Sequence, residues 1–547
     1  MGYHTAMTTA SQKASGGRRG GGYDDIVVGS GSAGCVLARR LADAGRRVLV
    51  LEAGPRDKVK EIHIPAGFPK LFRSALDWNY ETEPEDHLDG RRLFWPRGRV
   101  VGGCSSINAM LYIRGHRADY DRWRDQGNQG WGWDDVLPRF KRSEDQQRGA
   151  SEYHGTGGPL TVGDPRDPNP LSHRFVAAGA ELGFERNEDF NGAEQEGFGI
   201  FQVTQRAGKR CSAAVAFLHP AVGGNLELRS DAPVARVLFE GSRAVGVELQ
   251  RTGEVIRADG EVILCAGAIG SPQLLMLSGV GPADALRELG IDVVADLSGV
   301  GENLQDHPVV PVIYRAKGVE TLDEAESFKS LVRYLLWKRG PYTSTICEAG
   351  AFVRSREGLD RPDLQLHFLP AALTDHGVDR ATHKGFNFGP TLVLPESRGR
   401  ITLRSADPAA MPRIWARYLS VPGDVEVLVA GIKLARRLAA TEAFAEYAEG
   451  EVLPGPNVEG DEALAAYVHR IVETLYHPVG TCRMGPESAL DSERPPVVDA
   501  DLRVHGVEGL RVVDASIMPE ITAGNTNAPT LMIAEMAADR ILGRAAS

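Results

Sequence analysis

The stretch Asp25-Ile-Val-Val-Gly-Ser-Gly-Ser-Ala-Gly34 decides the fold, because a short β-branched run in it leads directly into three closely spaced glycines. Apolar residues with helical spacing follow from Cys35 to Ala44, and Gly45 marks the end of that segment. Val48-Leu-Val-Leu51 is then typical of a buried parallel strand, and it ends at Glu52. Strand, glycine loop, helix and strand in this order predict a complete βαβ unit.

The loop of this unit has the chemistry of an anion site. Its glycines would permit a tight turn, a close approach of the backbone to a pyrophosphate and close packing of the helix, and they are Gly29, Gly31 and Gly34. Ser32 and Ala33 lie between these glycines, and the free N–H groups at the start of the following helix suit phosphate oxygens. Glu52 follows about 20 residues later, where a carboxylate can bind ribose hydroxyls. The unit therefore predicts a bound dinucleotide, and by itself it does not distinguish FAD from NAD.

The composition of the chain excludes several classes of protein. At 547 residues the chain exceeds the usual size of one core, so two or three domains are expected. The net charge of −11 offers no electrostatic footprint for nucleic acid. The six cysteines are scattered without the spacing of metal ligands, which indicates a reducing compartment and no metal site. No stretch approaches the roughly 18 apolar residues needed to span a bilayer, so an integral membrane protein is not expected.

Further blocks along the chain carry a family resemblance. Arg97-Gly-Arg-Val-Val-Gly-Gly-Cys-Ser-Ser-Ile-Asn-Ala-Met-Leu-Tyr-Ile-Arg-Gly115 resembles the first signature of the glucose–methanol–choline flavoprotein oxidoreductases. Gly267-Ala-Ile-Gly-Ser-Pro-Gln-Leu-Leu-Met-Leu-Ser-Gly-Val-Gly281 resembles the second. Three more blocks match in the same order, namely Val300-Gly-Glu-Asn-Leu-Gln-Asp-His-Pro308, Tyr476-His-Pro-Val-Gly-Thr-Cys-Arg-Met-Gly485 and Val512-Val-Asp-Ala-Ser-Ile-Met-Pro519. The chain is most similar to the FAD-dependent primary alcohol dehydrogenases and choline-dehydrogenase-like members, from about Tyr23 to Leu542.

This resemblance implies an α/β fold with a Rossmann-like FAD-binding domain and a discontinuous α+β substrate domain built on an antiparallel sheet. The expected division is a disordered leader over residues 1–22, FAD-binding segments over 23–154, 221–311 and 466–547, and substrate-domain segments over 155–220 and 312–465. In the last of these, Leu364 to Leu369 is expected to be a strand. An amphipathic helix is expected after Pro422, with Val425, Leu428, Ile432, Ala435 and Ala439 on one face.

The resemblance also implies where FAD makes its contacts. Gly102-Gly103 and Ser105-Ser106 form a loop of small residues that can lie flat against a planar ring. Some family members carry in this loop a histidine bonded covalently to FAD, and Ile107 takes its place here, so we expect non-covalent FAD. Besides the glycine loop and Glu52, the implied cofactor contacts are Arg97, Val101, Gly102, Ser106, Asn108, Ala109, Met110, Val234, Ala266, Asp514 and Ala515.

A catalytic pair follows from the same resemblance. Oxidising an alcohol to a carbonyl removes the hydroxyl proton and a hydride from the same carbon, and a neutral imidazole can take that proton. His477 matches the histidine that the family uses as the base. The family's second active-site position falls on Asn527, whose amide would orient the substrate oxygen. Asn527 also reads as an ordinary N-cap of a helix over Thr530 to Leu542, and the block around His307 reads as a structural turn beneath the cofactor.

The predicted function is FAD-dependent oxidation of primary alcohols to aldehydes, with hydride transfer to flavin N5 and a quinone-type electron acceptor. An oxygen-using alcohol oxidase that produces hydrogen peroxide, and a non-redox lyase or photoenzyme of the same family, stay open as alternatives. A nicotinamide-dependent dehydrogenase and a non-catalytic FAD-binding protein are less consistent with the later blocks. The expected partners are a small alcohol and a quinone or oxygen, with no nucleic acid. The expected location is cytoplasmic, with at most peripheral contact with the inner membrane, and the oligomeric state is open.

Overall fold

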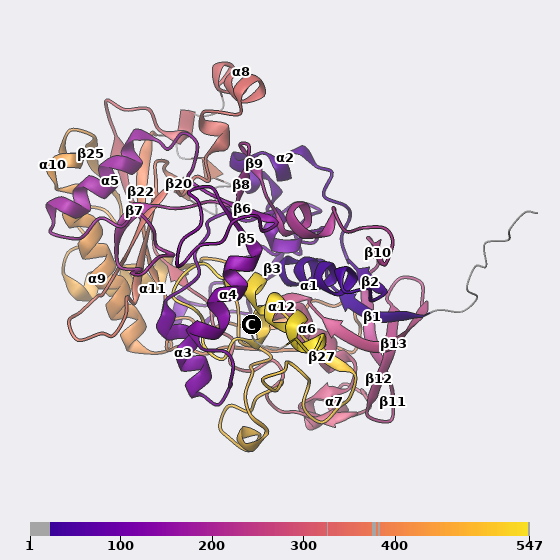
Figure 1. Ribbon diagram of the computed structural model, residues 1–547. Helices are drawn as coiled ribbons and strands as arrows, with labels where there is room; N and C mark the ends of the chain where they lie inside the picture. Colours follow the sequence, from indigo (N-terminus) through magenta and orange to yellow (C-terminus); the bar gives the residue numbers. More distant parts are fainter. Residues whose placement is uncertain (1–21, 325–326, 375–378, 381–382, 545–547) are drawn as a thin grey trace, which may run out of the picture.

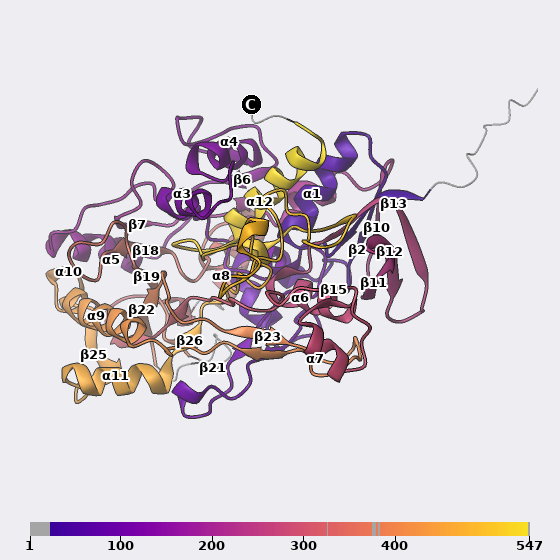
Figure 2. The same ribbon diagram turned by 90° about the horizontal axis from the view of Figure 1, so that it is seen from below.

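Two β-sheets lie on opposite sides of the molecule in the computed structural model, with helix α12 (Asn527–Ile541) between them (Figures 1 and 2). The structure describes residues 22–324, 327–374, 379–380 and 383–544. Residues 1–21 of the predicted leader lie outside these ranges. The mixed α/β architecture, with one sheet largely parallel and the other antiparallel, confirms the predicted fold class.

The first sheet is built around the predicted βαβ unit. Its strands β10, β2, β1, β13 and β27 run parallel in that order, and β12 and β11 extend it antiparallel from the first half of β13. Strand β2 and the last four residues of β1 are buried. Their continuous apolar runs are typical of parallel strands that are covered on both faces. The bounds are β1 (Tyr23–Val28), β2 (Val48–Leu51), β10 (Leu226–Arg229), β11 (Val234–Glu240), β12 (Arg243–Leu249), β13 (Val255–Leu264) and β27 (Leu510–Val512).

The second sheet is antiparallel and follows the order β25-β17-β22-β19-β18-β7, with β16 attached to β22 and β26 attached to β16. Strand β19 has the bounds expected from the sequence. Strands β16 and β26 also join this sheet, although they fall in segments that the sequence analysis gave to the FAD-binding domain, so that division stays a prediction. The bounds are β7 (Gly197–Ile200), β16 (Pro308–Val309), β17 (Val312–Ala316), β18 (Ala349–Val353), β19 (Leu364–Leu369), β22 (Gly385–Leu392), β25 (Ala448–Leu453) and β26 (Glu473–Thr474).

Helices cover both sheets. Helix α9 packs on β22 and β19 through the face expected from its apolar spacing, and all five residues of that face are buried. None of the helices in the described part of the chain is long and apolar enough to cross a bilayer. The main helices are α1 (Ser32–Asp43), α3 (Arg117–Asp125), α4 (Trp133–Ser143), α5 (Pro170–Glu181), α6 (Gly267–Leu277), α7 (Ala283–Glu288), α8 (Phe328–Trp337), α9 (Pro422–Ala439) and α11 (Gly460–Ile471).

Helix α12 begins three residues earlier than the sequence analysis expected, at Asn527 rather than Thr530. Pro529 therefore lies inside the first turn of the helix instead of just before the helix. Backbone N–H groups in the first turn have no partner within the helix, so a proline there loses no hydrogen bond. The helix is buried from Ala528 to Asp539 and packs against α1 and α4.

A buried carboxylate anchors α12 to both neighbouring helices. Glu535 has no exposed side-chain area, and it accepts hydrogen bonds from Arg40 of α1 at 2.7 Å and from Ser143 of α4 at 2.7 Å. Arg142 of α4 pairs with its other oxygen at 2.6 Å. Because these contacts hold α1 and α12 together, the N-termini of both helices face the same interior space.

We expect Glu535→Ala to lower the free energy of unfolding by about 3 kcal/mol, because breaking a buried ion pair leaves the partner charges uncompensated. Urea denaturation followed by circular dichroism measures this change. A matched control is Glu508→Ala, since the side chain of Glu508 is 71% exposed and pairs with Arg243 at 3.5 Å. That control is expected to change stability by less than about 0.5 kcal/mol. Equal effects of the two substitutions would show that Glu535 does not anchor α12.

Candidate active site

A cavity of about 1160 Å³ lies between the two sheets, larger than the pocket of an ordinary drug-sized ligand, which spans about 300–1000 Å³. The N-terminus of α1 lines it through Ser32 and Ala33, and the N-terminus of α12 through Asn527. Both helix starts therefore direct unpaired N–H groups toward one space, an arrangement that favours an anionic ligand.

The structure brings most of the predicted site residues together on the wall of this cavity. The predicted residues on the wall are Gly29, Gly31, Ser32, Ala33, Glu52, Arg97, Asn108, Ala109, Met110, Val234, Ala266, His477, Asp514, Ala515 and Asn527. Four others do not line the cavity and lie behind it, namely Gly34, Val101, Gly102 and Ser106. These four hold the loops in place: the Ser106 hydroxyl donates to the Val101 carbonyl at 2.8 Å, and the Gly102 N–H donates to the Ser30 carbonyl at 2.8 Å.

Two glycines of the first loop are required by close contacts. Gly29 has φ +104°, and a Cβ there would stand 2.4 Å from the Cys265 carbonyl oxygen. A Cβ on Gly34 would stand 2.0 Å from the Gly29 carbonyl oxygen. Any side chain at either position would separate α1 from β1 and β13, so the loop keeps its shape only with glycine.

Glu52 keeps part of its hydrogen-bonding capacity for a ligand. One carboxylate oxygen accepts from the Ser30 backbone N–H at 3.0 Å and the Ser30 hydroxyl at 2.7 Å, and the other accepts from the Gly54 N–H at 2.8 Å. A carboxylate has about four acceptor positions, so a ribose hydroxyl can still bind. Burial raises the pKa of Glu52, and these three donors act against that rise by favouring the charged form.

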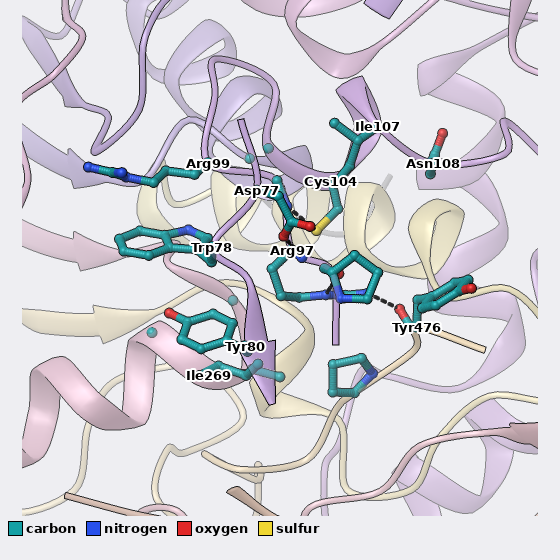
Figure 3. Close-up of a pocket in the computed structure, with 18 of the residues that line it drawn as sticks. Asp77, Trp78, Tyr80, Arg97, Arg99, Cys104, Ile107, Asn108, Ile269 and Tyr476 are labelled. Atoms are coloured by element: carbon teal, nitrogen blue, oxygen red, sulfur yellow. Dashed lines mark hydrogen bonds between the residues drawn. The ribbon is translucent and has the colours of Figure 1, made fainter. Parts of the chain in front are cut away.

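Arg97 holds the backbone of the segment Tyr476-His477, which carries the predicted base His477. Its guanidinium donates to the backbone carbonyl of Tyr476, as Figure 3 shows, while its own N–H donates to Asp77 at 2.9 Å. Tyr476 has φ +70°, which is uncommon for a residue with a side chain and persists only where the surroundings hold it. The strained backbone directs the next side chain, His477, onto the cavity wall.

A buried cation beside the cavity was not anticipated from the sequence. Arg210 is 2% exposed, and burial lowers its pKa to about 9, so it stays protonated near neutral pH. It donates to the side-chain oxygen of Asn108 at 2.8 Å, and the Met110 N–H donates to the same oxygen at 3.0 Å. With its oxygen occupied in this way, Asn108 can offer its amide N–H groups to a ligand in the cavity.

A chain of hydrogen bonds determines the protonation of His477. His307 Nε2 lies 3.2 Å from the Val393 carbonyl oxygen, which can only accept, so His307 carries its hydrogen on Nε2. Burial lowers the pKa of His307 to about 3, and the neutral ring then has no hydrogen on Nδ1. His477 Nδ1 lies 3.0 Å from that atom and therefore donates to it. His477 Nε2 is left without a hydrogen, as a general base requires.

His307 makes a contact that the sequence analysis did not anticipate. The block around His307 was interpreted as a structural turn beneath the cofactor, and its Nδ1 lies 3.0 Å from His477 Nδ1. The neighbouring Asp306 also accepts the backbone N–H of His477 at 2.7 Å, so the block positions both the backbone and the ring of His477.

Asn525, which the sequence analysis did not select, meets His477 in place of Asn527. The Asn525 amide nitrogen lies 3.3 Å from His477 Nε2, and its oxygen accepts from the buried Gln365 at 3.4 Å. The Asn527 side-chain oxygen instead accepts from the Ser32 hydroxyl at 2.7 Å, which ties the starts of α12 and α1 together. Two asparagines separated by one residue look alike in sequence, and only the start of the helix decides which one faces His477.

The surroundings of His477 favour its neutral form. Burial lowers its pKa well below the ordinary value, and the charge of Arg97 acts in the same direction. A second neutral imidazole lies on the wall, because burial lowers the pKa of His367 to about 3. His367 Nε2 has no hydrogen-bond partner within the described ranges. Among the described residues no group of three or more His, Cys, Asp or Glu side chains is arranged to hold a metal ion.

The sequence resembles known proteins over most of its length. A sequence model described as GMC oxidoreductase matches residues 23–309, and a second with the same description matches residues 395–534. The chain is 49% identical over 533 residues to a Pseudomonas putida protein named alcohol dehydrogenase (acceptor), covering 95% of this chain and 96% of that one. It is 46% identical over 542 residues to the mitochondrial choline dehydrogenase of Homo sapiens, covering 96% and 90%.

Solved structures share the same fold over nearly the whole chain. A pyridoxine 4-oxidase from Mesorbium loti has a TM-score of 0.87 at 34% identity, covering 95% of this chain and 99% of its own. A formate oxidase of Aspergillus oryzae RIB40, described with a modification of its FAD, has a TM-score of 0.89 at 28% identity, covering 96% and 99%. The chain therefore shares its fold with an FAD-containing protein, and the cavity lies between the two large sheets of that fold.

Proposed function

Because this chain belongs to the GMC oxidoreductase family, and is thus an FAD-dependent oxidoreductase acting on CH–OH donors, we propose that it oxidises primary alcohols to aldehydes. The observation that carries this proposal is the position of His477 on the wall of the cavity that the glycine loop also lines, with its Nδ1 held 3.0 Å from His307 Nδ1. The name of the Pseudomonas putida relative, an alcohol dehydrogenase that uses an acceptor, supports the same reaction.

The protein's part in the reaction is to remove the hydroxyl proton. His477 Nε2 accepts this proton from the alcohol, which general-base catalysis accelerates by about 10² to 10⁴. Bound FAD supplies the acceptor for the hydride that leaves the same carbon. The hydrogen bond from His477 Nδ1 to His307 keeps the ring in the reactive tautomer and in one orientation. Burial of the imidazole then favours release of the proton before the next turnover.

Asn525 is the residue that we propose to orient the alcohol oxygen. Its amide nitrogen is a hydrogen-bond donor beside His477 Nε2, so an alcohol oxygen placed between them could accept from the amide while its proton moves to the imidazole. Gln365 fixes the orientation of this amide by donating to its oxygen. Asn527 is assigned instead to joining the two helix starts.

The residues on the wall fit FAD without a covalent bond. We assign the pyrophosphate to Gly29, Gly31 and the start of α1, the ribose to Glu52, and the flavin edge to Asn108 and Ala109. Val234 is assigned to the adenine. Ile107, at the position where some family members carry the linking histidine, is an apolar side chain packed at 3% exposure and has no nucleophilic atom.

We propose a quinone as the electron acceptor, in keeping with the relatives named dehydrogenases. An oxygen-using oxidase is the second candidate, because solved structures of similar fold are described as oxidases. Formation of hydrogen peroxide during aerobic turnover distinguishes the two. Steady turnover in the absence of any acceptor would indicate the lyase or photoenzyme alternative instead.

Anaerobic mixing with a panel of alkyl, aryl and choline-type alcohols is expected to bleach the flavin absorbance, and His477→Ala is expected to slow this bleaching by about 10² or more. Stopped-flow absorbance measures the rate. His173→Ala is a control, since His173 lies exposed on α5, and it is expected to behave as the parent protein. No bleaching with any alcohol would contradict alcohol oxidation, and normal bleaching in His477→Ala would contradict the assignment of the base.

Replacing each of the two asparagines by alanine in turn tests their separate roles. Asn525→Ala is expected to lower the rate of flavin reduction by about 10-fold or more. Loss of an orienting hydrogen bond raises the activation free energy of this step by about 1.4 kcal/mol or more. Asn527→Ala is expected to weaken FAD retention during gel filtration while changing the reduction rate of the FAD-loaded enzyme much less. The reverse pattern would restore the assignment of Asn527 as the oxygen anchor.

Denaturing the purified yellow protein with trichloroacetic acid is expected to release all FAD into the supernatant, because no covalent bond is expected at Ile107. The absorbance spectra of supernatant and washed pellet measure the distribution. Flavin that stays with the washed pellet would show a covalent bond, formed by a nucleophilic side chain of the cavity at a position other than Ile107.

A further inference from the structure

Helix α8 turns its apolar face away from the protein. Phe328, Leu331, Val332, Leu335 and Leu336 follow the spacing of a single helical stripe, which in a globular protein normally faces the core. Here the exposed fractions of Phe328, Leu335 and Leu336 are 82%, 59% and 66%. Tyr334, outside the stripe, is the buried side chain of the helix. Figure 1 shows α8 projecting from the body of the molecule.

This stripe is the largest departure from burial in the described part of the chain. The four most exposed large apolar side chains there all lie on α8, and the fourth is Trp337 at 62%. The next most exposed, Val255 at 52%, lies on the other sheet at the start of β13. Single exposed apolar residues are common, but a gathered set marks a surface that contacts a partner.

Basic residues accompany the stripe along the helix and just beyond its end. Residues 327–344 contain four basic residues and no acidic one, although the whole chain carries −11, and the four are Lys329, Arg333, Lys338 and Arg339. Arg333 and Arg339 share a single carboxylate, Asp167, at 3.5 Å each. Lys338 lies over the ring of Tyr334 at 4.5 Å. One carboxylate does not neutralise this set, so the helix remains basic.

We propose that α8 docks on the surface of a lipid bilayer that contains anionic headgroups. An apolar stripe beside lysines and arginines, with tryptophan and phenylalanine at the ends, is the chemistry that inserts at the boundary between headgroups and acyl chains. The basic residues bind the anionic headgroups, and the stripe gains the burial that the protein itself does not provide.

The position of α8 connects this surface to the cavity. The short helix η6 (Pro341–Thr343) packs against both α8 and η1 (Pro65–Leu71). Immediately after η6, residues 345–347 line the cavity, and Phe68 of η1 lines it too. Docking would bring this wall next to the membrane, where lipophilic alcohols and quinones dissolve. The proposal that the protein binds lipid depends only on α8. The further idea that docking delivers an alcohol or a quinone to the cavity depends on the proposed function.

Flotation of the holoenzyme with lipid vesicles tests the docking. The parent protein is expected to float with vesicles of phosphatidylcholine and phosphatidylglycerol, and much less with phosphatidylcholine alone or at high salt. The double variant L335Q/L336Q is expected to lower the partition coefficient by about 10-fold or more, since two leucines no longer leave water. V255Q, a single change of the same kind at an exposed apolar residue of β13, is expected to bind as the parent does.

Three outcomes would overturn the proposal. They are absence of parent binding to the anionic vesicles, equal binding by L335Q/L336Q, and a parent oligomer that this variant dissociates in light scattering, which would make the stripe an interface between copies of the chain. Circular dichroism and FAD absorbance confirm that the variant is folded. Turnover with a soluble acceptor is expected to be the same in parent and variant. If neither the parent nor the variant turned over an alcohol, the proposed function would be contradicted, whereas the vesicle-binding result would still stand.

Discussion

The direction of one hydrogen bond, from His307 Nε2 to the Val393 carbonyl, is the constraint on which the site depends. A carbonyl oxygen cannot donate, so the proton positions along His307 and His477 follow in order and leave His477 Nε2 as an acceptor. The pairing of short strands brings these residues together. Pro308 of β16 pairs with Thr474 of β26, and β16 also pairs with β22, whose end leads to Val393. The antiparallel sheet therefore sets the chemistry of the base as well as the walls of the cavity.

The parallel sheet contributes the anion-binding side of the same cavity. Close contacts at Gly29 and Gly34 hold α1 against the strands, and Glu535 fastens α12 to α1 and α4. The hydrogen bond between Ser32 and Asn527 then joins the two helix starts. The glycine loop and His477 thus line one cavity, because the starts of α1 and α12 and the segment just before α12 all reach its wall.

Burial keeps the histidines of the site neutral, whereas the buried Arg210 stays charged. The imidazoles of His307, His367 and His477 are kept neutral by burial, which suits proton acceptance. Arg210 stays charged although it is buried, and it acts on the cavity through the oxygen of Asn108. Burying this cation is a local cost that a negatively charged dinucleotide, placed in the cavity as we propose, would offset.

The sequence by itself determined the βαβ unit, the glycine loop with Glu52, the position of His477 and the buried face of α9, because each depends on local spacing. Only the tertiary structure decided that Asn525 meets His477, that His307 orients it, and that Arg210 holds Asn108. These choices depend on where α12 begins and on strand pairs between residues about 170 positions apart in sequence, as with His307 and His477. The stripe on α8 gives the same lesson, since periodicity shows that an apolar face exists, whereas packing decides whether it meets the core or the solvent.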